Sequence, residues 1–353
     1  MNKVKPLVAI LLSSAFNLSH AQSSVSLFGI VGGGVRWVNG TKGGATVEYS
    51  NIITPNRFGL TGSEDIGGGV KVIFRLENGF NSSNGTLATN NVLWSRQAYV
   101  GIDGAYGRLT MGRQFSSFED LGISLDPSQI GGADPAIIPT GLLGVNFFTL
   151  DGRFNNSVKY TNGFGGAKLS ASYSFGGVAG NQRAGSNYSA AASYDTGPLR
   201  GGIAYQRTYN ADASQMAQNY YAGGVWQIGP VRAYVSYLVL TVSGSTKAPS
   251  QRRDDVPQGG VVWQITPAFA VTAAYYDDIA SNLSNVHGAS GHKQTAYVIG
   301  EYFLSKRTEI YLEADRNHFS GAYKKDPTNI AVLNRSPGSS GITGVSVGLQ
   351  TKF

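Results

Sequence analysis

The end of the chain alternates between two kinds of side chain. Residues 344–353 read G-V-S-V-G-L-Q-T-K-F, with mostly apolar residues from Val345 to Phe353 at odd positions and polar residues or glycine between them. Successive side chains of a β-strand point to opposite faces, so this pattern predicts a strand with one apolar face. Chain termini usually fray in water, and an aromatic residue at the very end is therefore unusual for a strand in a soluble core.

The same two-residue period recurs along the chain. It is clear in residues 70–77, 154–160, 166–175 and 231–237. In residues 154–160, for example, the period places Phe154 on the apolar face together with Val158 and Tyr160. No apolar run of 18 residues follows residue 21, which excludes a membrane-spanning helix. The sequence therefore predicts an all-β protein.

Short turns separate these strands at regular intervals. They are expected near Gly68, Gly104, Gly163, Gly197, Gly229, Thr266 and Ser305. Most intervals are roughly 35 residues, which fits two strands of about ten residues and one longer loop, as in tilted membrane-spanning strands. Seven short turns on one rim imply sixteen strands.

One interval is much longer than the others because it contains residues 115–152. This segment holds Pro127, Pro135, Pro139 and several glycines, and it breaks the alternation. Loops of that length inside a domain are usually functional or disordered. Its apolar residues favour a functional loop that packs against another part of the protein.

Sixteen such strands are compatible with a soluble sandwich, a repeat solenoid or a membrane barrel. The polar faces carry Ser, Thr, Asn, Lys and Arg, whereas the apolar faces carry Val, Leu, Ala, Tyr and Phe. Strands can cross lipid only as a closed barrel, with an apolar band outside and a polar lumen inside. We therefore expect a transmembrane 16-stranded antiparallel β-barrel in which residues 341–353 pair with residues 25–38. Phe353 would then face lipid or its aromatic rim.

The first residues predict export. Residues 1–21 combine Lys3 and Lys5, a short apolar run and small residues before Gln22, which is the pattern of a secretory signal peptide. Removing them lowers the formal net charge from +7 to +5 (two lysines), too small and dispersed a charge to indicate nucleic-acid binding. The chain has no cysteine, which excludes disulfides and thiolate chemistry. Residues 22–353 are expected to form one barrel domain.

Several sequence blocks resemble a known family. These are R-F-G-L-T-G-S-E-D-I-G-G-G-V (residues 57–70), R-Q-A-Y-V-G (96–101), M-G-R-Q-F (111–115), N-N-S-V-K-Y (155–160) and the terminal Phe353. In this order they are similar to the general porins of Gram-negative outer membranes, especially those of beta-proteobacteria. The similarity covers essentially the whole chain after the signal peptide.

The resemblance implies a homotrimer in the outer membrane, with short periplasmic turns and long external loops. It implies that residues 115–152 are a third loop folded into the lumen, where they narrow it. It also implies that the barrel-assembly machinery reads Phe353 as an assembly signal. Here Gln350, Thr351 and Lys352 precede that aromatic, where such porins often have a more basic run.

Porins of this type set wall arginines against carboxylates of the inward loop at the narrowest zone. Matching blocks point to Arg57 and Arg96, and residue parity supports Arg57 because Phe58 and Leu60 take the other face. The polar faces of two strands add further basic residues. The full set of expected constriction residues is Arg57, Lys71, Arg75, Arg96, Arg153 and Lys159 on the wall, with Glu119 and Asp120 on the loop.

These residues predict a water-filled channel for passive diffusion of ions and small hydrophilic solutes. Charged rings in a pore wall filter ions by sign. With Lys168 added, seven basic candidates face Glu77, Glu119 and Asp120, which predicts a mild preference for anions. No metal or cofactor is expected. We expect Arg113 to hold the loop in place or to form a subunit contact instead. Asp126 and Asp134 are expected at solvated positions of the loop.

Two alternatives stay open. A substrate-specific outer-membrane channel would share every feature above. A barrel enzyme would need a general base, usually histidine, beside a nucleophile or carboxylate. His287, His292 and His318 are expected in external loops, where solvated side chains are more common than catalytic ones. A structural or adhesive barrel fits less well, because such barrels are usually narrower.

Overall fold

The computed structural model describes residues 23–128, 135–138 and 145–353. The predicted signal peptide, residues 1–21, lies outside the described residues. Within the described part, seventeen strands form one antiparallel sheet. They are β1 (Ser24–Thr41), β2 (Gly44–Ser50), β3 (Arg57–Gly67), β4 (Val70–Gly79), β5 (Gln97–Gly104), β6 (Gly107–Phe115), β7 (Arg153–Phe164), β8 (Ala167–Ser174), β9 (Asn187–Asp195), β10 (Leu199–Tyr209), β11 (Met216–Ile228), β12 (Val231–Val242), β13 (Arg252–Thr266), β14 (Phe269–Ser281), β15 (Gly291–Phe303), β16 (Thr308–Phe319) and β17 (Gly341–Lys352).

The seventeen strands make a barrel of sixteen, because β2 and β3 are two halves of one barrel strand. Both pair with the same edge of β1: β3 with residues 24–30 and β2 with residues 34–41. Residues 51–56 interrupt this barrel strand and enter the lumen, where Ile52 is fully buried. The predicted number of sixteen is thus confirmed, although the break was not expected.

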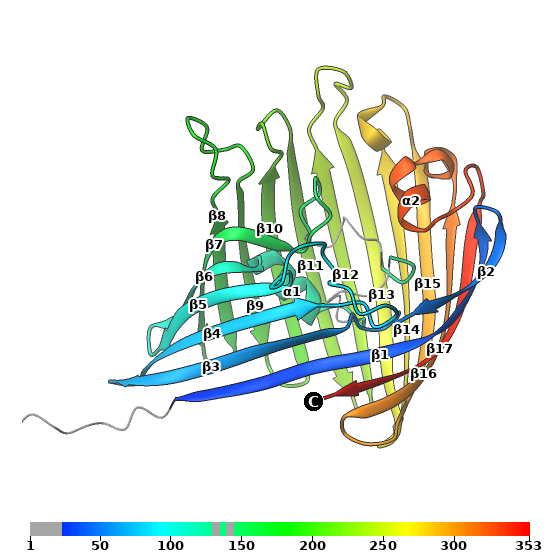
Figure 1. Ribbon diagram of the computed structural model, residues 1–353. Coiled ribbons are helices and arrows are strands. Elements are labelled where there is room, and N and C mark those ends of the chain that lie inside the picture. Colours follow the sequence, from blue (N-terminus) through cyan, green and yellow to red (C-terminus); the bar gives the residue numbers. More distant parts are fainter. Residues whose placement is uncertain (1–22, 129–134, 139–144) are drawn as a thin grey trace, which may run out of the picture.

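The sheet closes between its first and last strands. β1 pairs antiparallel with β17 from Ile30 opposite Lys352 to Asn39 opposite Thr343. Figure 1 shows the closed wall, with β1 and β3–β5 strongly tilted and β10–β16 steeper. Closure leaves no edge between first and last strands, and it confirms the pairing expected from the sequence.

Burial is inverted relative to a soluble protein. On β17, Val347 is 51% exposed, whereas its neighbour Ser346 is 1% exposed. The same contrast holds around the barrel, where apolar residues such as Leu27, Ile203 and Val235 are exposed on the outside. Polar residues such as Gln206, Asn219 and Thr295 are buried on the inside. The apolar face of each strand therefore forms the outer, lipid-facing surface.

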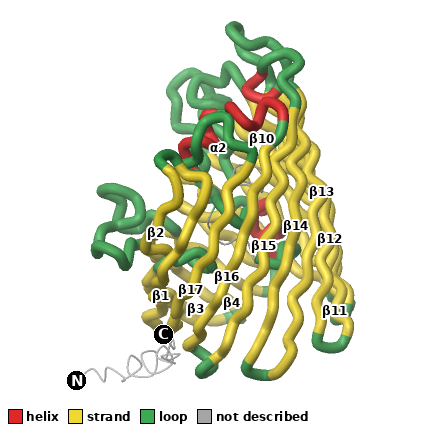
Figure 2. Tube along the Cα trace, turned by 90° about the vertical axis from the view of Figure 1, so that its right-hand side faces the viewer, coloured by secondary structure: helices red, strands yellow, loops and turns green. Residues whose placement is uncertain are grey.

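The two ends of the barrel differ. All seven predicted short turns are confirmed, between β3 and β4, β5 and β6, β7 and β8, β9 and β10, β11 and β12, β13 and β14, and β15 and β16. Figure 2 shows these turns and the carboxyl terminus at one end, with the long loops at the other. The long-loop end carries η1 (Leu283–Asn285), η2 (Gly321–Lys325) and α2 (Pro327–Val332). Among the described residues, no helix has the length and hydropathy needed to cross a membrane.

The segment 115–152 is called here the inner loop, and its described parts lie along the inside of the wall. It begins with α1 (Ser117–Ser124), whose N-cap Ser116 accepts a hydrogen bond from the backbone N–H of Glu119. One face of α1 packs on the wall: Phe118 lies 5.9 Å from the ring of Tyr221 on β11, and Leu121 contacts Gly202 on β10. The described parts confirm that this loop is folded into the lumen.

Further along, the inner loop is fastened to distant strands. The hydroxyl of Tyr276 on β14 donates to Asp126 at 2.8 Å, and the side-chain amide of Asn317 on β16 donates to the carbonyl of Ala136 at 2.7 Å. Ile137 and Ile138 are buried in the apolar cluster between loop and wall. The described parts of the inner loop thus contact wall strands between β8 and β16.

One strand departs from the predicted alternation. Phe154 was assigned to the outer face but is buried inside, 5% exposed. The pairing of β6 with β7 shifts register between Gly112 and Gln114, and Asn156 has a φ of 50°. β7 has one extra residue here, because Gly112 and Gln114 are two positions apart on β6 while their partners Ser157 and Phe154 are three positions apart. This bulge changes the face that Phe154 takes.

Candidate functional site

Three arginines surround one buried carboxylate on the inner wall. Glu77 on β4, 1% exposed, forms ion pairs with Arg96 at 2.6 Å, Arg75 at 2.6 Å and Arg57 at 3.7 Å. Arg57 is the first residue of β3, Arg75 lies on β4 and Arg96 directly precedes β5. The structure therefore brings together three of the predicted wall arginines.

Arg75 is the most accessible of the three. Its side chain is 30% exposed, compared with 16% for Arg57 and 8% for Arg96. Its guanidinium also stacks on the ring of Phe28 from β1, 4.2 Å from the ring centroid. Three guanidinium groups thus gather around the Glu77 carboxylate at one place on the lumen wall, called here the arginine cluster.

Arg153 and Glu119 extend the cluster toward the inner loop. Arg153, at the start of β7, stacks on the ring of Phe115 at 4.3 Å and interacts electrostatically with Arg57, Arg96 and Glu119. Glu119 is 3% exposed, and its Oε2 atom has no hydrogen-bond partner among the described residues. Burial raises the pKa of Glu119 well above its usual range, against the opposing influence of Arg153.

Lys159 and Asp120 form a second link between wall and loop. The Lys159 ammonium lies 2.6 Å from the carboxylate of Asp120 and also donates to the backbone carbonyl of Phe115 at 3.0 Å. Glu119 and Asp120 both lie in the first turn of α1, a position that the helix dipole favours for negative charge. The predicted opposition of Asp120 to a wall cation is present in the structure.

The structure does not bring Lys71 into this group. Lys71 is exposed and lies opposite Asp65 and Asp103 near the short turns. It is six residues from Glu77 along β4, which is about 20 Å of extended chain. Lys168, likewise, follows a short turn at the start of β8.

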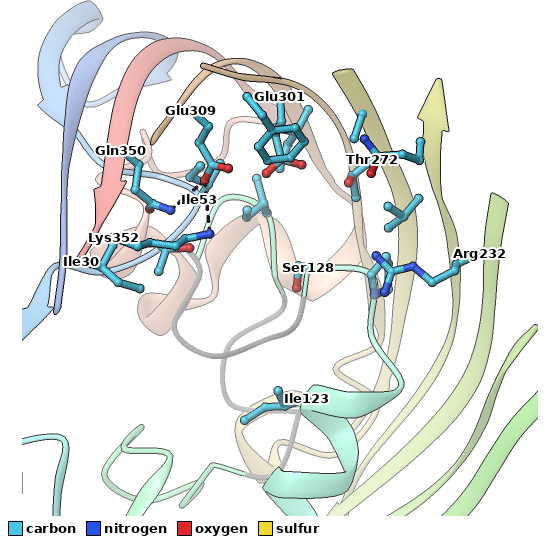
Figure 3. Close-up of a pocket in the computed structure, with 18 of the residues that line it drawn as sticks. Ile30, Ile53, Ile123, Ser128, Arg232, Thr272, Glu301, Glu309, Gln350 and Lys352 are labelled. Atoms are coloured by element: carbon cyan, nitrogen blue, oxygen red, sulfur yellow. Dashed lines mark hydrogen bonds and ion pairs between the residues drawn. The ribbon is translucent and has the colours of Figure 1, made fainter. Parts of the chain in front are cut away.

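A second charged region lies across the lumen. A cavity of about 480 Å³ reaches from Arg57, Ile53 and Phe115 to Arg232, Glu301 and Lys352. Figure 3 shows Glu309 linked to both Gln350 and Lys352, with Arg232 on the opposite side of the open space. Glu309 accepts from Gln350 at 2.8 Å and lies 3.7 Å from the Lys352 ammonium.

The sequence reasoning missed this second region. Arg232, Glu301, Glu309 and Lys352 all have the parity of polar, lumen-facing residues on their strands, and that parity was the available signal. The sequence does not show that these four residues face the arginine cluster, because the curvature of the barrel determines which strands lie opposite one another. The break at residues 51–56, which contributes Ile53 and Thr54 to the cavity, had no clear signal at all.

Of the two aspartates expected at solvated positions of the inner loop, the structure describes only Asp126, and that expectation is wrong. Asp126 was assigned to a solvated position, but it is 1% exposed and accepts hydrogen bonds from Tyr276 and from Ser128. Burial raises the pKa of Asp126 to about 6. Asp134 lies outside the described residues. Arg113, left out of the constriction, pairs with Asp151 at 2.5 Å and so ties the end of the inner loop.

The histidines are only partly where they were expected. His287 lies in an exposed loop, but His292 is on β15 and His318 on β16. Both strand histidines have the parity of outward-facing residues at the long-loop end. His292 Nδ1 lies 3.0 Å from Asp277. None of the three belongs to the lumen sites described above.

Comparison with known proteins agrees with the fold. The family model of the Gram-negative porins matches residues 7–322. An outer membrane porin protein of Bordetella pertussis is 27% identical, over 98% of this chain and 99% of that protein. Outer membrane porin protein 32 of Delftia acidovorans is 26% identical, over 99% of both chains.

Solved structures show the same fold. An anion-selective porin from Comamonas acidovorans superposes with a TM-score of 0.81 at 21% identity, covering 94% of this chain and all of that one. OmpT of Vibrio cholerae in its trimer form gives a TM-score of 0.69 at 13% identity, over 94% of this chain and 99% of that one. Three observations lead to one conclusion. The barrel is closed and has sixteen strands, an inner loop narrows its polar lumen, and the family model matches most of this chain. The chain belongs to the family of Gram-negative porins and forms a channel for passive diffusion in the outer membrane.

Proposed function

We propose that the channel prefers anions, and that the arginine cluster at Glu77 and the start of the inner loop form its constriction. The observation that carries this proposal is a group of cations at one place on the lumen wall: Arg57, Arg75 and Arg96 each form an ion pair with Glu77. Fixed charge at the narrowest part of a pore sets the sign of the ions that enter it. Anions are therefore drawn to this face of the lumen.

The surrounding charges support the same sign. Arg153 adds a fourth cation, while burial favours the neutral form of Glu119. Lys159 and Asp120 neutralise each other. Across the lumen, the positive charges of Arg232 and Lys352 are balanced by the negative charges of Glu301 and Glu309. That side of the wall therefore adds little net charge. The anion-selective porin from Comamonas acidovorans, which shares the fold, is consistent with this assignment.

We further propose that the protein is a homotrimer embedded in outer-membrane lipids and delivered to the barrel-assembly machinery by Phe353. The trimer form of the Vibrio cholerae protein, whose fold is similar, supports the oligomeric state. Phe353 is 48% exposed at the short-turn end of the outer surface, where a receptor could reach it before the barrel closes. The long loops would face the exterior.

Zero-current potentials in planar bilayers under a salt gradient test the selectivity. The wild-type channel should give the sign of an anion-preferring pore, and Arg75→Gln should reduce that potential because Arg75 is the most accessible guanidinium of the cluster. Arg316→Gln, on the outer face of β16, is the matched control and should leave the potential unchanged. A cation preference of the wild-type channel would overturn the proposal.

A further inference from the structure

The cavity that holds Arg232 and Glu301 lies between the inner loop and the short turns. Arg232 is the second residue of β12, and Glu301 lies two residues before the end of β15, so both are close to the short-turn end. Ile123, Pro127 and Ser128 of the inner loop line the same cavity. Its volume of about 480 Å³ is within the range of about 300–1,000 Å³ that is typical of small-molecule sites.

This part of the lumen is lined by apolar side chains, although many inward positions of the barrel are polar. Val262 on β13 and Ile299 on β15 are inward residues of the cavity wall. Phe303, Ile123 and Ile53 also line the cavity, and each of these three is only half-buried. An apolar surface inside a water-filled lumen favours contact with an apolar part of a solute.

Strand register joins the two charged residues through this apolar wall. Arg232 lies directly opposite Val262, which lies opposite Thr272 on β14. Thr272 in turn lies opposite Ile299. Glu301 is the next inward residue after Ile299 on β15. A continuous strip of inward side chains, two of them apolar, therefore leads from the guanidinium to the carboxylate.

Arg232 and Glu301 differ from the other charged residues of this region. Glu309 accepts a hydrogen bond from Gln350 and lies 3.7 Å from the Lys352 ammonium. Among the described residues, neither Arg232 nor Glu301 has a side-chain hydrogen bond or an ion pair, although the two interact electrostatically. Their strands are three spacings apart, about 14 Å along the wall. Figure 3 shows the two side chains on different sides of one open space.

We propose that this cavity binds an α-amino acid with an apolar side chain. The carboxylate of the ligand lies at Arg232, its ammonium group lies at Glu301, and its side chain lies against the apolar lining. Each charged group then gains a charge-assisted hydrogen bond. A simple organic anion is repelled by Glu301 and a simple cation by Arg232, whereas a zwitterion satisfies both. The proposal does not rest on the anion preference, because neither residue belongs to the arginine cluster.

Single-channel recording in symmetric salt at neutral pH, with L-phenylalanine as the probe, tests this assignment. Bound L-phenylalanine occupies part of the lumen beside the inner loop, so conductance should fall to a plateau with a measurable half-saturating concentration. Two analogues each lack one charge: 3-phenylpropanoate lacks the ammonium group and 2-phenylethylamine lacks the carboxylate. Each should need a roughly tenfold higher concentration, because it loses one charged hydrogen bond. Glycine, which has no side chain, should likewise bind at least roughly tenfold more weakly.

Arg232→Gln and Glu301→Gln locate the site. Each should raise the half-saturating concentration of L-phenylalanine roughly tenfold. In Glu301→Gln the ammonium group has lost its partner, so 3-phenylpropanoate should bind this variant no more weakly than L-phenylalanine does. Arg316→Gln, on the outer face of β16, is the matched control and should behave like the wild type. A recorded conductance step itself requires a folded channel, so weaker binding is not confused with misfolding.

Three results would overturn the proposal. The first is a wild-type conductance that does not saturate with L-phenylalanine. The second is equal half-saturating concentrations for L-phenylalanine and 3-phenylpropanoate, which would indicate a site for apolar anions. The third is equal values for Arg232→Gln and Arg316→Gln, which would place the site elsewhere. Arg75→Gln, the variant that tests the anion preference, should keep the wild-type value for L-phenylalanine, so the two proposals fail separately.

Discussion

The last residue, Phe353, exchanges two backbone hydrogen bonds with Gly29 on the first strand, each 3.0 Å long. The Phe353 ring lies over Gly29, at the position that a Cβ atom would occupy. The final aromatic is therefore part of the seam that closes the barrel, and glycine is required opposite it.

Gly29→Ala should weaken this seam. A methyl group would overlap the Phe353 ring and come within 2.9 Å of the backbone oxygen of Arg57. Overpacking of this kind usually costs about 1–3 kcal/mol. The temperature at which the folded, fast-migrating form is lost on gels should fall. Gly201→Ala is the control, since its added Cβ would meet only a backbone oxygen at 3.7 Å; equal effects of the two changes would contradict the role of the seam.

Glu77→Gln should increase the preference for anions. The change leaves Arg57, Arg75 and Arg96 in place and removes the carboxylate that they share. It should also lower thermal stability, because it removes a buried negative charge that attracts three guanidinium groups. Reversal potentials in planar bilayers measure the first effect. An unchanged reversal potential in a folded Glu77→Gln channel would show that ions do not sense this cluster.

Anion preference should fall as pH rises. Burial raises the pKa of Glu119, so this carboxyl group is neutral at low pH and becomes negative only as pH passes its raised pKa. A new negative charge beside Arg153 opposes anion entry. Reversal potentials measured across a pH series should therefore drift toward lower anion preference. Glu119→Gln should reduce the drift and keep the low-pH value; a drift as large as in the wild type would exclude Glu119 as its source.

Tyr276→Phe should loosen the inner loop. The Tyr276 hydroxyl donates to the buried carboxylate of Asp126, and loss of a hydrogen bond to a buried polar group costs about 1–3 kcal/mol. Single-channel recordings should show larger current fluctuations, because the loop borders the lumen. Tyr275→Phe, one residue away on the outer face, should record like the wild type. If the current fluctuations of Tyr276→Phe were as small as those of the wild type, the other contacts would be sufficient to hold the loop.

The sequence predicts most of the wall and the three arginines that meet at Glu77. The two-residue period and the glycine-rich turns are local signals, so the seven turns and the pairing of β1 with β17 follow from them. Arg57, Arg75 and Arg96 meet at Glu77 because they share inward parity on neighbouring strands or lie directly beside one.

The features that the sequence did not predict depend on the third dimension. The bulge at Asn156 reverses the face of Phe154 without changing the composition of the segment. Asp126 is buried only because the inner loop reaches β14. Arg232 and Lys352 face the arginine cluster across the lumen, and no local pattern along the chain encodes that distance.

The pairing of Ile30 with Lys352 also limits the order of events in biogenesis. β17 follows every other strand in the chain, so the cylinder cannot be completed before β17 has been made. Until that moment β1 and β17 each present a row of free amide and carbonyl groups, which are prone to join with other chains. The order of the strands therefore sets the earliest point at which the sheet can lose its two open edges.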